Sequence, residues 1–375
     1  MKHCDVLIVG GGPAGSSCAG KLHRHGVDVL LIDKQTFPRD KTCAGWITPP
    51  VLDLLDISEN EYSAQHVMQP ITRFRTGLIG GREIETNYSQ TVSYGIRRCE
   101  FDHYLLQRSK ATSQLGYPLK NLKRENQQWI VNDEISTQLL IGAGGHFCPV
   151  GRELGNRKQP GSSVVAAQEI EFEVDAALLD RGTISGDCPE LFFCQDLQGY
   201  GWCFRKGNFL NIGLGRVDRQ NISDHVENFC EFLRSRGKVV CEIPTRKHGH
   251  AYQLYERTLP RLYDDGVLLI GDSAGLSYAQ SGEGIRPAIE SGLIAADVVL
   301  SANENYQKKN LESYREKIIE RFGQPRKKAP SDWLPAGMLR FLAGRLMATH
   351  WFSRRVILDN WFLHTKESAL PQQYL

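Results

Sequence analysis

The sequence lacks several features that would place it in a specialised class of proteins. No apolar run reaches the roughly 18 residues that a bilayer-spanning helix needs. The N-terminal stretch MKHCDVLIVGGG is apolar only briefly before it enters glycines, so we expect no secretory signal peptide. With 45 Lys and Arg against 43 Asp and Glu, the formal net charge of +2 gives no reason to expect a nucleic-acid partner. These absences favour a cytoplasmic location.

Patterns typical of metal sites and disulfide scaffolds are missing as well. The 10 cysteines are few for 375 residues, and none lies in a CxxC pair or a His/Cys cluster with zinc-like spacing. The HGH triplet at 248–250 has no further ligands placed around it, so we expect no metal site. We expect most cysteines to be reduced and buried as small apolar side chains.

What the chain does contain is the pattern of an α/β protein. Its length exceeds the usual limit for one hydrophobic core, which predicts two closely joined domains. Residues 5–9 form a short apolar run ending in glycines, residues 14–25 have a helical pattern, and residues 27–33 form the next apolar run. This order predicts a βαβ unit with buried parallel strands.

The middle of the chain, about residues 155–260, has a different pattern. In EIEFEV, residues 169–174, apolar side chains alternate with three glutamates, as in an antiparallel strand with one solvated face. Residues 209–217 alternate similarly, whereas residues 266–275 return to the pattern of a buried strand. The first domain is therefore predicted to be discontinuous, with a second sheet inserted in it.

Helical periodicity predicts further helices at 100–114, 284–300 and 305–323, with short strands between 119 and 145. In the last segment, apolar residues at helical spacing are mixed with arginines: Met338, Phe341, Leu342, Leu346, Arg340, Arg345, Arg354 and Arg355. Two interpretations stay open. The segment is either a helix pair packed on the body of the protein, or an element at 330–363 that contacts a membrane surface or covers the substrate.

The motif GGGPAG places Gly10, Gly12 and Gly15 after the first strand and at the start of a helix. Glycines here permit a tight turn and close approach of the backbone to a pyrophosphate, and the helix N-terminus adds free N–H groups and a positive dipole end. Asp33 ends the second strand, where a carboxylate can accept the ribose hydroxyls of an adenine nucleotide. The combination predicts dinucleotide binding, against the alternative of a glycine-rich turn without function.

A second glycine pattern follows the buried run LLIGDSAG, residues 268–275. Gly271 and Asp272 lie at the carboxyl end of the predicted strand, where open α/β sheets bind ligands. Gly282 and Gly284 then begin another helix, whose bare backbone donors suit an anionic or electron-rich edge.

Taken in order, GxGxxG, Asp33, RDKTCAG, RRCEFD, GAGG, GDSAG and GEGI resemble the FAD-dependent para-hydroxybenzoate hydroxylase and geranylgeranyl reductase superfamily over about residues 5–300. Residues 199–215 look like the Tyr-x-Trp-x-Phe-Pro-Lys segment of the reductase branch, here Tyr200, Trp202, Phe204 and Lys206. Three residues depart from the family pattern: Arg205 and Ala279 replace prolines, and Gly144 replaces the aspartate of a GADG fingerprint.

The resemblance implies a Rossmann-like FAD-binding domain with an inserted antiparallel β-sheet substrate domain and C-terminal helices. The expected FAD-binding domain comprises 1–60, 95–155 and 262–302, the substrate domain 61–94 and 156–261, and the C-terminal helical segment 303–375. FAD is expected to bind in an extended form, with its isoalloxazine near the GEGI turn. The expected FAD-binding residues are Gly10, Gly12, Pro13, Ala14, Gly15, Asp33, Lys34, Arg39, Lys41, Cys43, Ala44, Gly45, Arg98, Gly271, Asp272, Gly282, Glu283, Gly284 and Ile285.

Five side chains are candidates for the catalytic site: Cys43, Trp46, Tyr200, Trp202 and Glu283. In the reductase branch a cysteine at the place of Cys43 lies near the isoalloxazine, but a reactive thiol also needs access and a lowered pKa, so reaction and packing both stay open. Tyr200 and Trp202 lie at i and i+2 of a strand, hence on one face, and could form an aromatic wall. Trp46 could line the substrate cavity or pack in the core. Glu283 could act as an acid or base, or complement a helix dipole.

The resemblance implies an FAD-dependent oxidoreductase, with NAD(P)H as the expected transient reductant. The leading hypothesis is a monooxygenase that acts through a reduced-flavin hydroperoxide on an aromatic or electron-rich substrate, including a side chain of a partner protein. One alternative is reduction of polyprenyl double bonds, as in geranylgeranyl reductases. The other is a flavin-binding sensor or assembly protein without turnover. The expected partner is thus a small-molecule, lipid or protein-borne substrate.

Overall fold

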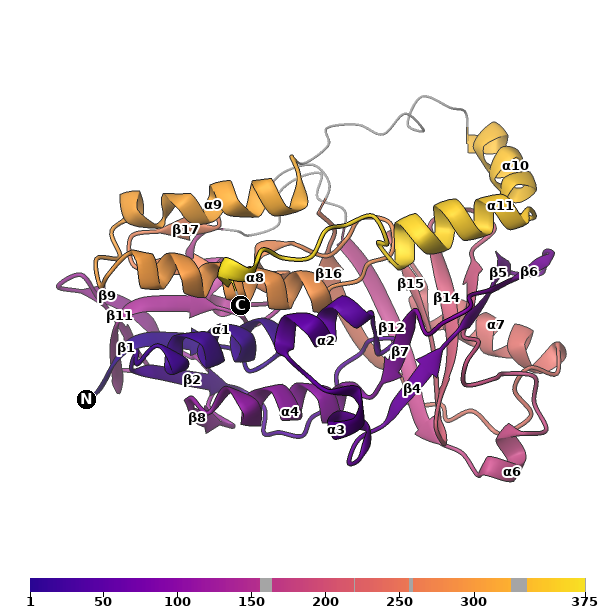
Figure 1. The fold of residues 1–375 in the computed structure, drawn as a ribbon, viewed down its shortest axis with the longest axis horizontal. Helices are drawn as coiled ribbons and strands as arrows, with labels where there is room; N and C mark the ends of the chain where they lie inside the picture. The colour runs from indigo at the N-terminus through magenta and orange to yellow at the C-terminus, as the bar shows by residue number, and fades with distance from the viewer. Residues whose placement is uncertain (156–163, 219, 256–258, 325–335, 375) are drawn as a thin grey trace.

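Two large sheets lie next to each other along the long axis of the molecule (Figure 1). The computed structural model describes residues 1–155, 164–218, 220–255, 259–324 and 336–374. One sheet has a parallel centre covered by helices, and the other is almost entirely antiparallel. This is the α/β architecture predicted from the sequence. The predicted domain limits themselves stay a prediction.

The first sheet has the strand order β17-β18-β11-β1-β2-β8. Its parallel strands are β1 (Lys2–Val9), β2 (Val29–Asp33), β8 (Thr112–Leu115), β11 (Ile135–Gly142) and β18 (Val267–Leu269). Antiparallel strands extend it: β9 (Leu122–Glu125), β10 (Gln128–Val131) and β17 (Tyr263–Asp264). Every residue of β2 and β18 is buried, as a sheet covered on both faces requires.

The helices that cover this sheet are α1 (Pro13–Arg24), α4 (Arg98–Ser109), α5 (Pro149–Glu153), α8 (Ile285–Ser301) and α9 (Lys308–Phe322). Helix α1 packs against both α4 and α8. At Gly292 of α8, a Cβ atom would lie 2.4 Å from the carbonyl oxygen of Ala14, so the glycine permits this close approach.

The prediction of a helix at 100–114 was wrong at its C-terminal end. Helix α4 ends at Ser109 because Lys110 adopts a left-handed conformation, with φ of 55°. The next residues form β8, which pairs in parallel with β2. A left-handed lysine has no marker in the sequence, so the helical pattern was extended across it.

The second sheet has the order β16-β12-β15-β14-β13-β5-β6. Its strands are β5 (Arg73–Leu78), β6 (Glu83–Asn87), β12 (Val164–Glu173), β13 (Glu190–Phe193), β14 (Gly199–Lys206), β15 (Phe209–Arg216) and β16 (His248–Gln253). Helix α7 (Ile222–Ser235) covers one face. A small third sheet, β3 (Trp46–Ile47), β7 (Ser93–Ile96) and β4 (Met68–Ile71), lies next to β14. Shorter helices are α2 (Pro49–Leu55), α3 (Glu59–Ser63) and α6 (Ala176–Leu179).

The C-terminal helices lie on the other face of the second sheet (Figure 1). They are α10 (Ala336–Met347), α11 (His350–Phe352), the π-helical stretch η3 (Ser353–Phe362) and the short η4 (Gln372–Tyr374). Ile357, Leu358 and Phe362 are fully buried against aromatic residues of the sheet. The first interpretation of this segment, a helix packed on the body of the protein, therefore holds for η3. Helix α10, in contrast, leaves apolar residues exposed. Residues 330–335 lie outside the described part of the chain.

The candidate flavin site

A cavity of about 450 Å³ lies where the two sheets meet, beyond the carboxyl ends of β1, β2 and β18. All five candidate catalytic residues line it. From the expected FAD-binding set, its wall contains Gly10, Gly12, Pro13, Ala14, Asp33, Lys34, Arg39, Lys41, Cys43, Ala44, Arg98, Asp272, Gly282, Glu283, Gly284 and Ile285. The fold thus brings together residues that are more than 200 positions apart in the sequence.

Three residues of that set, Gly15, Gly45 and Gly271, do not line the cavity. Each is tightly packed beside residues that do; at Gly271, with φ of 61°, a Cβ atom would lie 3.0 Å from the Cβ atom of Ala14. A Cβ atom at Gly15 would lie 1.9 Å from the carbonyl oxygen of Gly10, so glycine there permits the sharp turn between β1 and α1. At Gly45, with φ of 66°, a Cβ atom would lie 2.2 Å from the carbonyl oxygen of Ile96. These glycines act on the shape of the site through the backbone.

The turn between β1 and α1 has the geometry of a phosphate-binding turn. Gly10 has φ of 121°, and a Cβ atom there would lie 2.4 Å from the carbonyl oxygen of Ala143. Helix α1 begins at Pro13, whose missing N–H costs nothing at this position. Asp33 accepts hydrogen bonds from the backbone N–H groups of Gly11, at 2.7 Å, and Gln35, at 2.8 Å. The carboxylate is therefore fixed beside the helix N-terminus, with lone pairs left for a ligand.

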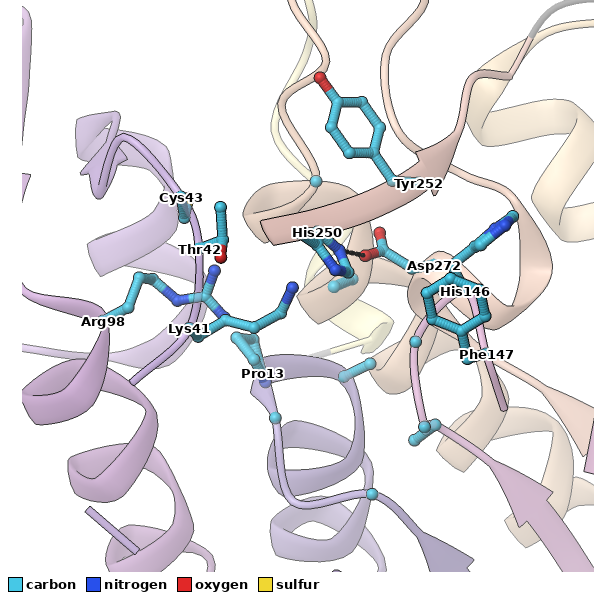
Figure 2. Close-up of a pocket in the computed structure, with 18 of the residues that line it drawn as sticks. Pro13, Lys41, Thr42, Cys43, Arg98, His146, Phe147, His250, Tyr252 and Asp272 are labelled. Carbon is cyan, nitrogen blue, oxygen red and sulfur yellow. Dashed lines mark hydrogen bonds and ion pairs between the residues drawn. The ribbon is translucent and has the colours of Figure 1, made fainter. Parts of the chain in front are cut away.

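Basic side chains lie next to this turn (Figure 2). Arg98 forms a two-point ion pair with buried Asp102, with both N–O distances at 2.8 Å, and Arg39 lies 3.2 Å from the same carboxylate. Burial lowers the pKa of Lys41 to about 8, although Asp272 opposes that shift. Arg39 and Arg98 share one buried carboxylate, and Lys41 lies beside Asp272, so three cations face two carboxylates. The remaining positive charge suits a pyrophosphate.

Asp272 follows β18 and is held by two neighbours, of which Figure 2 labels His250. His250 Nε2 lies 3.4 Å from its Oδ2 atom, and Ser277 donates a hydrogen bond to Oδ1 at 3.1 Å. Burial raises the pKa of Asp272, but His250 and Lys41 outweigh it, so the pKa lies well below its ordinary value. Sequence analysis missed His250: the HGH triplet was considered only as a metal site, and nothing in it predicts a partner in the loop after β18.

Cys43 is half-buried, and a polar network beneath it fixes its backbone. The side-chain amide of Asn211, on β15, donates to the Cys43 carbonyl oxygen at 3.2 Å. The same amide nitrogen lies 3.1 Å from a Glu169 oxygen and 3.0 Å from a Glu171 oxygen. The Asn211 oxygen accepts the indole N–H of Trp202 at 2.7 Å. One side chain therefore joins the cysteine segment to the aromatic strand β14.

Lys206, the last residue of β14, is fully buried below this network. Its ammonium group donates to Glu171 at 2.6 Å and to the Ile96 carbonyl oxygen at 2.9 Å. A Cβ atom at Gly45 would lie 2.5 Å from Lys206 Nζ, so glycine makes room for the lysine. Burial raises the pKa of Glu169 to about 7, although Lys206 opposes the shift. The lysine of the reductase-like segment is thus a support for the Cys43 loop.

An aromatic wall closes the cavity on the side of the second sheet. Tyr200 and Trp202 both line the cavity, which confirms that they share one face of β14. Trp46 stacks on Phe204 and Phe362, with ring centroids 5.7 Å and 5.4 Å apart. Trp46 is only 8% exposed and also lines the cavity. It therefore both packs in the core and forms part of the cavity wall.

Arg205 shows why a residue other than proline is tolerated in this segment. Side chains alternate along β14, so Arg205 points away from the cavity with Cys203. Its guanidinium group donates to Asp180 at 2.8 Å. The departure from the family pattern therefore lies on the opposite face of the strand.

Most cysteines are buried small side chains, as predicted from the sequence. All ten are free; Cys43, Cys99 and Cys241 are half-buried and the others are buried.

The residues present fit a long dinucleotide such as FAD. A glycine turn, the N-terminus of α1, Asp33 and basic side chains line one part of the cavity wall. The N-terminus of α8, which begins after Gly284, and the aromatic wall line the same cavity. These features define a dinucleotide-binding flavoprotein, and they agree with the comparisons that follow.

Residues 3–116 match the FAD binding domain family. An uncharacterised protein of Methanosarcina barkeri is 30% identical over 315 residues, 80% of this chain and 76% of that protein. The chain belongs to the FAD-dependent para-hydroxybenzoate hydroxylase and geranylgeranyl reductase superfamily, and it is an FAD-dependent oxidoreductase.

Two relatives carry the names of reductases. The menaquinone reductase of Mycobacterium tuberculosis is 28% identical over 325 residues, 79% of this chain and 76% of the relative. The digeranylgeranylglycerophospholipid reductase of Methanocaldococcus jannaschii is 26% identical over 336 residues, 84% and 82% of the two chains. These relatives favour the reductase alternative over the monooxygenase that led the sequence-based hypotheses.

Solved structures show the same fold. A geranylgeranyl bacteriochlorophyll reductase-like protein from Thermoplasma acidophilum has a TM-score of 0.74 at 22% identity, covering 93% of this chain and 88% of its own. A flavin-dependent halogenase has a TM-score of 0.67 at 18% identity, covering 98% and 70%. At these identities the similarity concerns the fold alone.

Proposed function

We propose that this protein is an FAD-dependent reductase that saturates carbon–carbon double bonds in the prenyl chain of a lipid. The observation that carries the proposal is the aromatic wall beside Cys43, formed by Trp46, Tyr200 and Trp202. A prenyl chain has no polar groups, so its binding depends on apolar burial and dispersion contacts, which such a wall supplies. The names of the two reductase relatives support the same reaction class.

The side chains of the cavity have distinct roles in this proposal. Asp33 and the turn from Gly10 hold the adenine half of FAD, and Arg39, Lys41 and Arg98 offset the charge of its pyrophosphate. When bound, FAD supplies the hydride for the double bond, after reduction by an external donor that we expect to be NAD(P)H. The isoalloxazine ring is expected near the N-terminus of α8, which would stabilise negative charge on the reduced ring. The aromatic wall excludes water.

The test is an anaerobic experiment on the FAD-loaded protein. The flavin is reduced with NADPH or dithionite, and its absorbance is followed after mixing with a prenyl lipid or with oxygen. We expect rapid reoxidation by the prenyl lipid and no acceleration of the oxygen reaction by that lipid. A lipid-accelerated reaction with oxygen that gives a hydroxylated product would support the monooxygenase instead. Flavin that no electron donor reduces would support a sensor or assembly role.

We further propose that α10 and α11 contact an anionic membrane surface from which the lipid is taken. Five exposed apolar side chains on α10 and α11 lie among four arginines of α10 and the start of η3: Met338, Phe341, Leu342, Leu346, Trp351, Arg340, Arg345, Arg354 and Arg355. Trp351 is 66% exposed and Phe341 60%. Apolar side chains mixed with arginine suit the boundary between headgroups and acyl chains of anionic lipid. Among the described helices, none is both long and apolar enough to cross a bilayer.

Sedimentation with vesicles tests this contact. We expect binding to vesicles that contain phosphatidylglycerol and weak binding to pure phosphatidylcholine. The double variant Phe341→Ser, Trp351→Ser should bind less, whereas Val240→Ser, which changes an exposed side chain outside the C-terminal helices, should bind like the unchanged protein. Equal binding by all three proteins would contradict the proposal. The cytoplasmic location stays a prediction.

A further inference from the structure

Glu283 belongs to the expected FAD-binding set, but no contact with FAD described above uses its buried carboxyl group. It lies in the turn before α8, and its side chain is 8% exposed. Neither carboxyl oxygen forms a hydrogen bond with any residue that the structure describes. A buried carboxylate without hydrogen bonds is costly, so the group favours its protonated form. Burial accordingly raises the pKa of Glu283 to about 7, with His364 opposing the shift.

An imidazole connects this acid with the surface. His364 follows η3, and its Nε2 atom lies 3.8 Å from Glu283 Oε2. Its Nδ1 atom lies 3.4 Å from Glu367 Oε1. The side chain of His364 is 6% exposed, whereas that of Glu367 is 35% exposed. The Nε2 atom also lies 3.5 Å from Ser281 Oγ. The three acidic and imidazole side chains thus form a series of ion-pair contacts from the cavity wall to solvent.

The C-terminal segment that carries His364 and Glu367 is held in place over the GxG turn. The Tyr278 ring stacks on the His364 ring with centroids 3.9 Å apart, and its hydroxyl donates to Glu367. The carbonyl oxygen of Ser368 accepts hydrogen bonds from Arg286 at 3.1 Å and Arg321 at 3.0 Å. His364 itself has φ of 48°, a conformation that asparagine and glycine also tolerate.

Other charged groups near Glu283 come from α8, α9 and β14. Glu290 on α8 is neutralised by Arg286, at 2.9 Å, and by Arg321 of α9, at 2.6 Å. Tyr200 of β14 faces the acid from the cavity side as a neutral group, since burial raises its pKa well above the ordinary value. Unlike Glu290, Glu283 forms no ion pair with an arginine of the described residues, although the charge of Arg286 also opposes the rise of its pKa.

We propose that Glu283, His364 and Glu367 form a proton path from solvent to the cavity, and that Glu283 donates the proton that completes double-bond reduction. This inference rests on the proposed function. The π bond breaks, a hydride adds to one carbon, and the Glu283 proton adds to the other, so that two C–H bonds form. Both electrons arrive with the hydride, and so ultimately from the external donor. The Glu283 carboxylate then takes the Nε2 proton of the His364 imidazolium, and solvent, reached past Glu367, protonates the neutral imidazole again.

The first test measures the acid itself, without turnover. Infrared spectra of the oxidised FAD-loaded protein, recorded over a range of pH, should show a protonated carboxyl band that is lost around pH 7 and is absent in Glu283→Gln. In His364→Asn the midpoint should move upward, because the charge that opposes the rise of the Glu283 pKa is removed. A midpoint that His364→Asn leaves unchanged, or a band that persists in Glu283→Gln, would overturn the path.

The second test is a single turnover of the anaerobically reduced protein with a prenyl lipid. Glu283→Gln should slow flavin reoxidation by about 10²- to 10⁴-fold, the usual contribution of general acid catalysis. His364→Gly should be slower than the unchanged protein and partly restored by added imidazole, a rescue that a purely structural role would not give. Glu312→Gln, an exposed acid on α9, is the matched control and should react normally.

The outcomes distinguish a failure of the proton path from a failure of the proposed function. If the unchanged protein reacts with the prenyl lipid and Glu283→Gln reacts at the same rate, the proton path is wrong and the proposed function stands. If the unchanged protein does not react with any prenyl lipid, the proposed function fails, and with it the role of Glu283 as donor. FAD content is measured for each variant so that loss of cofactor is not mistaken for loss of the proton.

Discussion

Asn211 is the residue whose removal should most directly disconnect the Cys43 segment from the second sheet. It is 1% exposed, and its amide oxygen accepts the Trp202 indole N–H. Its amide nitrogen lies within hydrogen-bond distance of the Cys43 carbonyl oxygen and of two glutamate oxygens. Asn211→Ala leaves the buried indole N–H without a partner, which costs about 1–3 kcal/mol by itself. Loss of the donor to the buried carboxylates adds to this. We predict a decrease of about 2–4 kcal/mol in the free energy of unfolding, together with weaker FAD retention.

Urea denaturation of the FAD-loaded protein, followed by tryptophan and flavin fluorescence, measures this change. Asn60→Ala, at an exposed site, is the control and should change the free energy by less than about 0.5 kcal/mol. Asn211→Asp keeps an acceptor for the indole but places a third carboxylate beside Glu169 and Glu171, so its cost should grow from pH 6 to pH 8. If Asn211→Ala changed the free energy of unfolding as little as the control does, the stabilising role of this network would be refuted.

Three further predictions concern stability and cofactor binding. Gly45→Ala should destabilise the protein clearly more than the control Gly26→Ala. Both glycines have positive φ, but at Gly26 no atom lies within 4 Å of the added methyl group. Equal thermal unfolding midpoints for the two variants would contradict this. Burial raises the pKa of native Glu169 from 4.5 to about 7, so native protein keeps a proton that unfolded chains release, and wild-type stability falls as pH rises between these values. Between pH 5 and pH 8, the free energy of unfolding should therefore fall by about 2–3 kcal/mol less in Glu169→Gln than in wild type. Urea denaturation that shows the same pH dependence for both proteins would contradict a buried, protonated Glu169. Asp272→Asn should retain less FAD on gel filtration, because Lys41 and His250 lose their carboxylate partner; undiminished FAD content would oppose the proposed site.

Local sequence patterns were sufficient to predict the turn and helix start that carry the expected nucleotide-binding residues. The turn from Gly10, the helix α1 and Asp33 are neighbours in the chain, and short-range spacing determines their geometry. The same is true of the GxG start of α8. Alternation along β14 was enough to place Tyr200 and Trp202 on one face.

The polar supports of the site were not predictable, because they join distant parts of the chain. Asn211 reaches the Cys43 carbonyl across 168 positions, and Lys206 reaches the Ile96 carbonyl across 110. His364 approaches Glu283 only because η3 packs on the second sheet and brings the following segment over the GxG turn. Such contacts depend on how the two sheets meet, and no local pattern specifies that.

Product analysis of the anaerobic reaction is the most direct test of the central claim. The FAD-loaded protein is given a stoichiometric electron donor and a prenyl lipid without oxygen, and the lipid is analysed by mass spectrometry. The account predicts a gain of two hydrogens for each double bond reduced, with no added oxygen and with deuterium incorporated when the solvent is D₂O. A lipid recovered unchanged while the flavin stays reduced, or a product that forms only with oxygen and carries an oxygen atom, would contradict it.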